Sequence, residues 1–227
     1  MDSNNEQQFK IILGSSSVAR KQILAEMGYD FTTMSADIDE KAIREEKPED
    51  LVMVLAKAKA DAILKKLQDA GTPENTTLLI AADTVETVKP KLLVGEEDAR
   101  PTLLITCDQV VVYEGMIREK PSSKEEARQF LNDYSGGHAA TVSSVLVTNL
   151  STGFRKGDCD KVEIYFHDIP ESAIDKLIEE GIVLYVAGGL IIEHPLILPY
   201  VKEVVGETDS VMGLPKALTR RLIDDVL

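Results

Sequence analysis

Segments with the pattern of a strand alternate along this chain with segments that have the pattern of a helix, and this order constrains the fold most strongly. An apolar run over 10–14 ends in glycine, as a short buried strand does, and precedes a predicted helix over 18–27. A longer helix is predicted over 48–68 and a strong strand over 103–113. Strands that alternate with helices pack as layers, so we predict an α/β fold.

The remainder of the chain follows the same order, with one exception. Further predicted elements are strands over 31–35, 139–148 and 162–166 and helices over 121–134, 170–181 and 215–227. The exception is the stretch 69–102, where a strand over 78–85 does not connect cleanly with its neighbours. We therefore predict a single domain over residues 1–227 in which 69–102 is an insertion.

The charge of the chain restricts the classes of partner. Its 227 residues carry 25 Lys and Arg against 39 Asp and Glu, a net charge of −14, which argues against general nucleic-acid binding. The polar, acidic start is unlike a secretory signal, and the apolar runs are shorter than the ~20 residues that span a bilayer. Two cysteines form no disulfide framework. We therefore expect a cytoplasmic protein with no nucleic-acid or membrane partner.

The junction after the first predicted strand has the features of an anion site. Its residues are Gly14-Ser15-Ser16-Ser17-Val18-Ala19-Arg20. Free backbone N–H groups, small hydroxyls and an arginine at the start of a helix suit a phosphate. The alternative is that the serines only cap the helix, as serine runs very often do.

Lys59 stands out on the long predicted helix. The four-residue spacing of Leu55, Lys59 and Ile63 places this lysine on the apolar face. A buried ammonium group is costly without a partner, so the position indicates a carboxylate or phosphate nearby. The alternative is that the aliphatic stem lies along the apolar face while the ammonium group reaches solvent.

Asp108 lies inside the apolar strand predicted over 103–113. Strands rarely contain an aspartate unless a metal ion, a water or another group satisfies it. Lys120 follows a Glu-Gly turn, where a hairpin can return it to the end of the strand, and Glu40 supplies a second carboxylate. Carboxylates that hold a divalent ion, together with cations that hold phosphate oxygens, are typical of a metal-assisted phosphate-anhydride site.

Two other residues bear on this interpretation. Asp83 also follows an apolar run, but it lacks the turn glycine and the lysine that follow Asp108, so we favour Asp108 as the strand aspartate of the site. Cys107, beside it, is predicted to be a small buried side chain rather than a nucleophile.

Several short motifs occur in a fixed order along the chain. They are the segments 13–20, 37–40, 55–60, 107–111, 119–121, 135–138 with Thr141, and 213–215. In this order they resemble the Maf (septum formation inhibitor) family of nucleoside triphosphate pyrophosphatases. The resemblance implies an inosine-triphosphatase-like α/β fold with an elongated mixed sheet flanked by helices. It also implies hydrolysis of a nucleoside triphosphate between its α and β phosphates, with Mg²⁺ or Mn²⁺, by a cytoplasmic and often dimeric enzyme.

The resemblance assigns roles to most of the candidate residues. Asp108 would be the catalytic carboxylate and would share a metal ion with Glu40. The residues that would hold the substrate are Ser15, Ser17, Arg20, Lys59 and Lys120. Of all the residues to which the resemblance assigns a role, Lys59 and Asp108 are the two that also stand out from the sequence pattern, because they are charged at apolar positions.

Three features of the sequence bear on which base the substrate carries: the residues after the last serine, residue 109 and residue 193. The family commonly has a proline and an arginine after the last serine, where this chain has Val18 and Ala19. Gln109 and Glu193 stand where the dTTP/UTP-hydrolysing branch has threonine and glutamine, and they resemble the branch that acts on 7-methyl-GTP. The Glu193 carboxylate could accept hydrogen bonds from the guanine N1–H and 2-amino groups, and its charge suits a cationic methylated base.

Two other functions stay open at this point. One is hydrolysis of a pyrimidine triphosphate such as UTP, CTP or dTTP. The other is a non-catalytic nucleotide-binding regulator of cell division. The two carboxylates and two lysines favour an enzyme, since binding alone does not require a strand carboxylate beside anionic phosphates.

Overall fold

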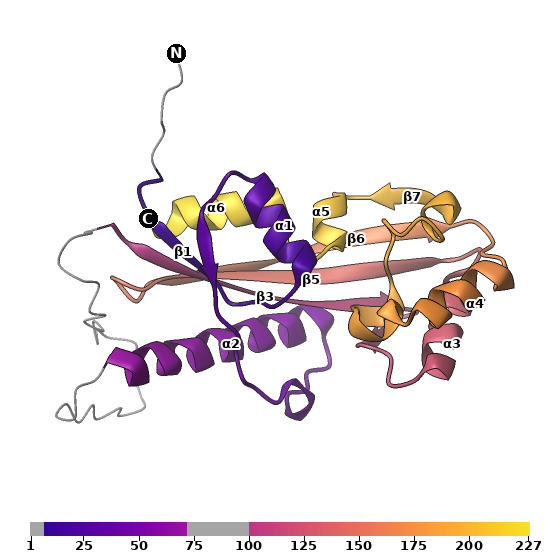
Figure 1. Ribbon diagram of the computed structural model, residues 1–227, viewed down its shortest axis with the longest axis horizontal. Helices are drawn as coiled ribbons and strands as arrows, with labels where there is room; N and C mark the ends of the chain where they lie inside the picture. The colour runs from indigo at the N-terminus through magenta and orange to yellow at the C-terminus, as the bar shows by residue number, and fades with distance from the viewer. Residues whose placement is uncertain (1–6, 72–99) are drawn as a thin grey trace, which may run out of the picture.

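The computed structural model describes residues 7–71 and 100–227, which form a seven-stranded sheet with helices on both faces (Figure 1). The strands are β1 (Lys10–Leu13), β2 (Phe31–Thr33), β3 (Thr102–Tyr113), β4 (Met116–Arg118), β5 (His138–Asn149), β6 (Arg155–Phe166) and β7 (Val201–Val205). The α-helices are α1 (Val18–Glu26), α2 (Pro48–Gly71), α3 (Lys124–Tyr134), α4 (Glu171–Glu180), α5 (Thr208–Val211) and α6 (Lys216–Val226). The predicted α/β fold is confirmed.

The sheet is mixed and elongated. Its strand order is β2-β1-β3-β5-β6-β7, and β4 pairs with β3 outside this path. β1 is parallel to β2 and β3, whereas β5 and β6 are antiparallel to their neighbours. The long strands β3, β5 and β6 run along the long axis of the molecule (Figure 1).

The parallel pairing of β1 with β3 places the predicted anion loop beside the strand aspartate. Leu13 pairs with Ile105, and the N–H of Gly14 donates to the Ile105 carbonyl at 2.7 Å. The chain therefore leaves β1 next to the point where β3 continues towards Asp108. Gly14 is required there, because a Cβ at this position would lie 2.6 Å from the Thr106 side chain and 2.7 Å from Ile63.

Alternate residues of β3 face opposite layers of the fold. Leu103 and Ile105 join the core beneath α1 and α6, whereas Leu104 joins the core beneath α2. Asp108 shares the parity of Leu104 and so faces α2. This helix buries the predicted apolar face and continues to Gly71, beyond the predicted end at residue 68. Among the described residues, no helix combines the length and the apolar character needed to cross a membrane.

The far end of the sheet has its own core. Tyr134 of α3, Ile164 of β6 and Leu177 of α4 belong to one buried cluster, which also contains Val111 from the end of β3. Figure 1 shows α3 and α4 side by side at that end, on the same side of the sheet as α2. The site described below lies between this core and the one that holds α1.

Four segments differ from their predicted structure. β6 begins at Arg155, seven residues before the predicted start at residue 162. The prediction missed the first half of this strand because that half is polar and exposed and lacks apolar alternation. β7, a half-exposed edge strand, and the four-residue helix α5 were not predicted. The short 3-10 turns Ile182–Tyr185 and Ala187–Gly189 were not predicted either.

The stretch 69–102, predicted as an insertion, is described only at its ends. Residues 69–71 belong to α2, and Thr102 begins β3. The predicted strand over 78–85 and Asp83 lie outside the described residues.

Candidate active site

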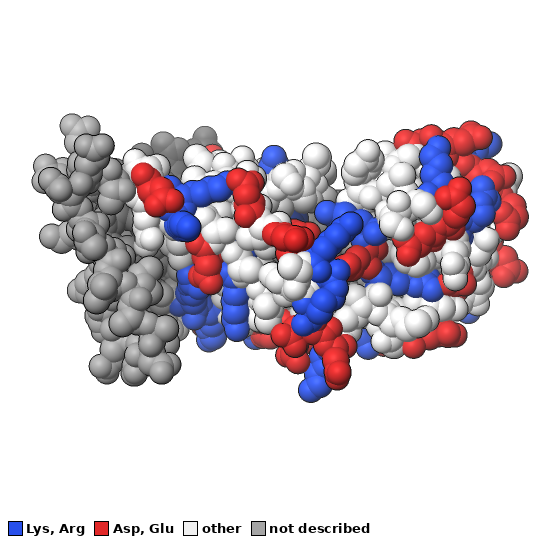
Figure 2. All heavy atoms as spheres, turned by 90° about the horizontal axis from the view of Figure 1, so that it is seen from below, with Lys and Arg blue, Asp and Glu red and all other residues white. Residues whose placement is uncertain are grey.

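A cavity of about 940 Å³ lies where the loop after β1, the middle of β3 and the segment after α4 meet. It has the size of pockets that hold a nucleotide-sized ligand. Every predicted site residue lines it: Ser15, Ser17, Ala19, Arg20, Glu40, Lys59, Asp108, Gln109, Lys120 and Glu193. Figure 2, which views the molecule from the side of α2, shows a band of basic side chains across the middle of this face, flanked by acidic ones. The charge of −14 is therefore not spread evenly over the surface.

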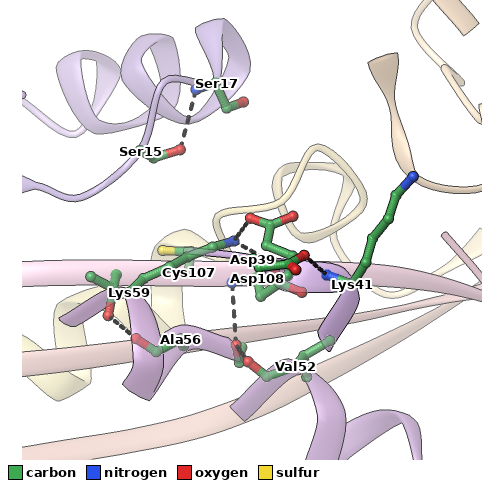
Figure 3. A network of polar contacts seen from close by, with 12 residues as sticks. Ser15, Ser17, Asp39, Lys41, Val52, Ala56, Lys59, Cys107 and Asp108 are labelled. Atoms are coloured by element: carbon green, nitrogen blue, oxygen red, sulfur yellow. Dashed lines mark hydrogen bonds and ion pairs between the residues drawn. The ribbon is translucent and has the colours of Figure 1, made fainter. Parts of the chain in front are cut away.

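The serine loop both caps α1 and lines the cavity. Ser17 is the N-cap of α1, and its hydroxyl accepts a hydrogen bond from the N–H of Arg20 at 3.4 Å. The Ser15 hydroxyl accepts from the N–H of Ser17 at 3.2 Å (Figure 3). The capping interpretation is thus confirmed, and it does not exclude the anion-binding one, because the same start of the helix lines the cavity.

Lys59 joins two carboxylates within the cavity. Its Nζ lies 2.5 Å from Oδ1 of Asp108 and 2.8 Å from Oε1 of Glu40 (Figure 3). Lys59 and Asp108 are 9% and 8% exposed, whereas the Glu40 side chain is 43% exposed. The prediction that Lys59 has an anionic partner is confirmed, and its alternative, a lysine that reaches solvent, is wrong.

Hydroxyl groups of the sheet fix α2 so that Lys59 faces Asp108. The Ser144 hydroxyl of β5 donates to the Val52 carbonyl at 2.7 Å and accepts from the N–H of Asp108 at 3.3 Å. The Thr106 hydroxyl of β3 donates to the Ala56 carbonyl at 2.8 Å (Figure 3). Both acceptors lie on α2, one turn apart, so the helix can neither slide nor rotate without breaking a buried hydrogen bond.

The two carboxyl groups differ in their electrostatics. Burial raises the pKa of Asp108 above its ordinary value, although the Lys59 ammonium, and to a lesser degree Arg20, oppose the rise. Burial also acts to raise the pKa of Glu40, but the hydrogen bond and charge of Lys59 outweigh it, with help from Lys120 and Arg20. The pKa of Glu40 is therefore lowered. Asp108 is therefore the stronger base of the two carboxyl groups, and Glu40 is the more firmly ionised one.

Arg20 ties α1 to two distant segments. Its Nε donates to the Gly213 carbonyl at 2.9 Å, and its Nη1 donates to the Cys107 carbonyl at 2.9 Å. Its Nη2 makes no hydrogen bond to any residue in the described part of the chain, and Arg20 lines the cavity. The guanidinium group is held by backbone on one side, which fixes its orientation towards a ligand.

The Gln109 amide is oriented by its own protein contacts. Its Nε2 lies 3.0 Å from the Ser210 carbonyl, 2.8 Å from the Val211 carbonyl and 3.0 Å from the Ser143 hydroxyl. Carbonyl groups only accept, so the nitrogen of the amide must point towards α5. The oxygen Oε1, an acceptor, is then the atom of Gln109 that is left for a ligand.

Lys120 reaches the cavity by the predicted hairpin. β3 turns at Glu114 and Gly115, both with positive φ, and pairs antiparallel with β4, which leads back to Lys120. Ala19 is half-buried and Glu193 is exposed where they line the cavity. Cys107 is fully buried, and burial raises the pKa of its thiol to about 11, which agrees with the prediction that it is not a nucleophile.

Comparison with known protein families identifies this arrangement. The family model described as Maf-like protein matches residues 10–226. The chain belongs to the Maf family. This membership confirms the resemblance noted in the sequence, and the mixed sheet agrees with it.

Relatives of this Maf chain carry three different names. A 7-methyl-GTP pyrophosphatase of Dictyostelium discoideum is 38% identical over 95% of this chain and 96% of its own. A dTTP/UTP pyrophosphatase of Agathobacter rectalis is 29% identical over 92% of this chain and 93% of its own. A nucleoside triphosphate pyrophosphatase of Salinispora tropica is 25% identical over 96% of this chain and 84% of its own. All three names describe a pyrophosphatase that acts on nucleoside triphosphates; the first two specify different bases, and the third specifies none.

The donor set of this Maf site suits a hard cation only in part. Within residues 7–71 and 100–227, no group of three His, Cys, Asp or Glu side chains could hold a metal ion. Glu40 and Asp108 both contact the Lys59 ammonium group, and together they offer two carboxylates. Mg²⁺ is commonly bound by one or two carboxylates together with waters and substrate phosphates, so these residues fit such an ion when the substrate supplies further oxygens.

Sequence reasoning missed several residues of the Maf site. Ser143 and Ser144 are adjacent polar residues in a strand of apolar ones, a signal that could have found them. Val211 and Met212 line the cavity from the unpredicted helix α5 and its end, and nothing in their local pattern indicates this. Tyr185 lines it as well, from a 3-10 turn that the pattern did not predict.

Proposed function

We propose that this protein hydrolyses a nucleoside triphosphate to the monophosphate and pyrophosphate. The observation that carries the proposal is the buried Lys59, which lies between Asp108 and Glu40 beside a serine loop at a helix N-terminus. Cations and backbone N–H groups suit phosphates, and a buried carboxylate beside them suits the activation of water. The names of the relatives describe this same reaction.

The phosphates are held by groups from three elements. The start of α1 supplies backbone N–H groups and the hydroxyls of Ser15 and Ser17, and its Arg20 supplies an oriented guanidinium group. Lys59 and Lys120 add positive charge from α2 and from the residues after β4. These groups neutralise the charge that develops on the leaving pyrophosphate.

Asp108 acts as the general base. It accepts a proton from a water whose oxygen attacks the α-phosphorus, and the bond between that phosphorus and the bridging oxygen to the β-phosphorus breaks as pyrophosphate leaves. The raised pKa of Asp108, caused by its burial, makes it a stronger base, while Lys59 favours its ionised form. Glu40, with its lowered pKa, stays ionised beside it.

Glu40 and Asp108 would hold a divalent cation, Mg²⁺ or Mn²⁺, together with phosphate oxygens of the substrate. When bound, such an ion supplies positive charge that polarises the phosphate under attack. In its absence Lys59 holds the two carboxylates close to each other.

We propose 7-methyl-GTP as the preferred substrate. Glu193 and the free oxygen of Gln109 are both acceptors, and guanine offers two donor groups on one edge, its N1–H and its 2-amino group. A uracil or thymine ring has one ring N–H between two carbonyl acceptors. It can therefore donate only one hydrogen bond to the Glu193 and Gln109 oxygens, and its own carbonyl oxygens face these acceptors unfavourably. Residue 19 is alanine where the family commonly has an arginine, so this position adds no positive charge beside Glu193 and Gln109. The alternative is a pyrimidine triphosphate.

We also propose that the enzyme works in the cytoplasm on free nucleotides, as a homodimer and without a nucleic-acid or membrane partner. The net charge of −14 and the resemblance to enzymes that are often dimeric support this. Light scattering after size-exclusion chromatography tests the dimer.

The deciding experiment is a nucleotide panel with pyrophosphate and orthophosphate detected separately. Wild-type protein is given 7-methyl-GTP, GTP, UTP, CTP and dTTP with Mg²⁺, then with Mn²⁺. We expect pyrophosphate alone, fastest from 7-methyl-GTP, and a loss of about 100-fold or more in kcat in Asp108→Asn. Asp175→Asn, on the exposed side of α4, is the matched control and keeps full activity. Nucleotide binding without pyrophosphate release from any member of the panel would instead support a binding protein, such as a regulator of cell division.

A further inference from the structure

Tyr185 is an aromatic residue that the protein leaves largely uncovered at its active-site cavity. It ends the 3-10 turn Ile182–Tyr185, lines the cavity, and is 78% exposed. Among the lining residues in the described part of the chain it is the only aromatic one. Ile182, on the same turn, also lines the cavity and is 39% exposed. These two side chains give the cavity an apolar, aromatic surface that is accessible to a ligand, and ligand pockets are commonly lined in this way.

The segment that carries Tyr185 is firmly attached to the rest of the fold. The N–H of Gly188 donates to the Glu119 carbonyl at 2.8 Å, and the Tyr134 hydroxyl donates to the Gly188 carbonyl at 3.0 Å. A Cβ on Gly188 would lie 2.6 Å from the Val111 side chain, so the segment packs directly against β3. The ring of Tyr185 therefore extends from a fixed support.

The same segment carries Glu193, the acidic residue of the cavity wall. His194 accepts from the N–H of Leu196 at 3.2 Å through Nδ1, and its Nε2 lies 2.9 Å from Glu180 of α4. These contacts fix the turn next to Glu193. One rigid segment thus supplies both an aromatic ring and a carboxylate to the cavity.

We propose that Tyr185 stacks on the base of the bound nucleotide and selects a cationic, methylated purine over a neutral base. The proposal rests on the proposed function, because it names the part of the site that binds the base. An aromatic face attracts a cation in addition to the stacking that any base gains, and 7-methylguanine carries a positive charge on its ring system. The Glu193 carboxylate adds attraction for the same charge and accepts from the donor edge.

Fluorescence gives a test that does not depend on turnover. The chain has no tryptophan, so Tyr185→Trp creates a protein with a single tryptophan at the proposed contact. We expect 7-methyl-GMP to quench its fluorescence in a saturable way, and GMP and UMP to require at least tenfold higher concentrations. Phe154→Trp, on an exposed site outside the cavity and 53% exposed in the wild type, is the control and shows no saturable quenching.

Kinetics give the second test. Tyr185→Leu removes the aromatic face and keeps an apolar side chain, so we expect KM for 7-methyl-GTP to rise about tenfold with kcat nearly unchanged. KM for UTP changes less, because a neutral base loses only the stacking contact and has no cation–π attraction to lose. We expect Tyr185→Phe to keep the wild-type KM values, because the ring rather than the hydroxyl group makes the contact.

The outcomes separate this inference from the function on which it rests. If the wild type releases pyrophosphate from 7-methyl-GTP but Tyr185→Leu has unchanged KM and the fluorescence of Tyr185→Trp is not quenched, the stacking proposal is wrong and the enzyme stands. If Tyr185→Leu raises KM equally for 7-methyl-GTP, GTP and UTP, Tyr185 stacks without selecting the cation, and the selectivity proposal is wrong. If the wild type releases no pyrophosphate from any nucleotide while 7-methyl-GMP still quenches the fluorescence of Tyr185→Trp, the stacking proposal stands and the proposed activity fails.

Discussion

Replacing Lys59 with methionine tests the centre of the site through protein stability. Methionine keeps most of the length of the side chain and removes the ammonium group that contacts Asp108 and Glu40. Asp108, 8% exposed, is then a buried charge without this partner. Removing one partner of a buried ion pair costs about 3–5 kcal/mol, and we expect Lys59→Met to lose that much free energy of unfolding at about pH 8. The half-exposed Glu40 adds little, because solvent screens it.

The loss depends on pH in a direction that the pKa of Asp108 fixes. Burial already raises this pKa, and Lys59 opposes the rise, so the pKa of Asp108 is higher still in Lys59→Met. The folded variant therefore binds a proton more tightly than the unfolded chain does. Its free energy of unfolding falls as the pH rises from the unfolded pKa through the folded one, and recovers as the pH is lowered. We expect the deficit relative to the wild type to shrink between about pH 8 and about pH 5.

The assay is urea unfolding followed by far-ultraviolet circular dichroism, since the chain has no tryptophan. Lys66→Met is the matched control: Lys66 lies on the same helix and pairs with Asp37, but both side chains are exposed. Its loss is expected to stay within about 1 kcal/mol. The double variant Lys59→Met/Asp108→Asn regains most of the loss, because both charges of the buried pair are absent. Equal losses for the two methionine variants, or a loss for Lys59→Met that is the same at every pH, would refute the reasoning.

Four further substitutions have defined outcomes. Glu193→Gln is expected to reduce the ratio of kcat/KM for 7-methyl-GTP to that for UTP severalfold, measured side by side, because the amide keeps one acceptor and loses the charge. Ser144→Ala leaves the Val52 carbonyl and the N–H of Asp108 without this hydroxyl, and should cost about 1–3 kcal/mol in urea unfolding. Gln109→Leu removes the hydrogen bonds to α5 and should raise KM for every nucleotide, with no gain in pyrimidine turnover. Gly14→Ala should lower the melting temperature, because its Cβ meets Thr106 at 2.6 Å; an unchanged value would contradict the close approach.

The centre of the site was predictable from sequence because it violates local patterns. Lys59 is charged on an apolar helix face, and Asp108 is charged within an apolar strand; the cost of burying each charge alone indicates a partner. The hairpin that returns Lys120 was predictable because its turn has a local signature, Glu114 and Gly115. Periodicity likewise predicted the buried face of α2, since that face repeats along one element.

Other residues that line the cavity were not predictable in the same way. Val211 and Tyr185 come from segments far from Gln109 in the sequence, and only tertiary contacts bring them to the same cavity. The first half of β6 escaped prediction because its pairing with β5 is made by backbone hydrogen bonds, which do not require apolar side chains. A four-residue helix such as α5 has too few residues to show a period.

The contacts of Gln109 couple this residue of β3 to the segment that contains α5. The amide of Gln109 holds the carbonyls of Ser210 and Val211, and Arg20 holds the neighbouring Gly213. A threonine at position 109 has a single hydroxyl donor on a shorter side chain, so it cannot replace both hydrogen bonds. We therefore expect a substitution at position 109 of this chain to release the carbonyls of Ser210 and Val211. Because the Gly213 carbonyl that orients Arg20 lies on the same short segment, the change would also disturb the support of the Arg20 guanidinium group unless residues 208–213 change with it.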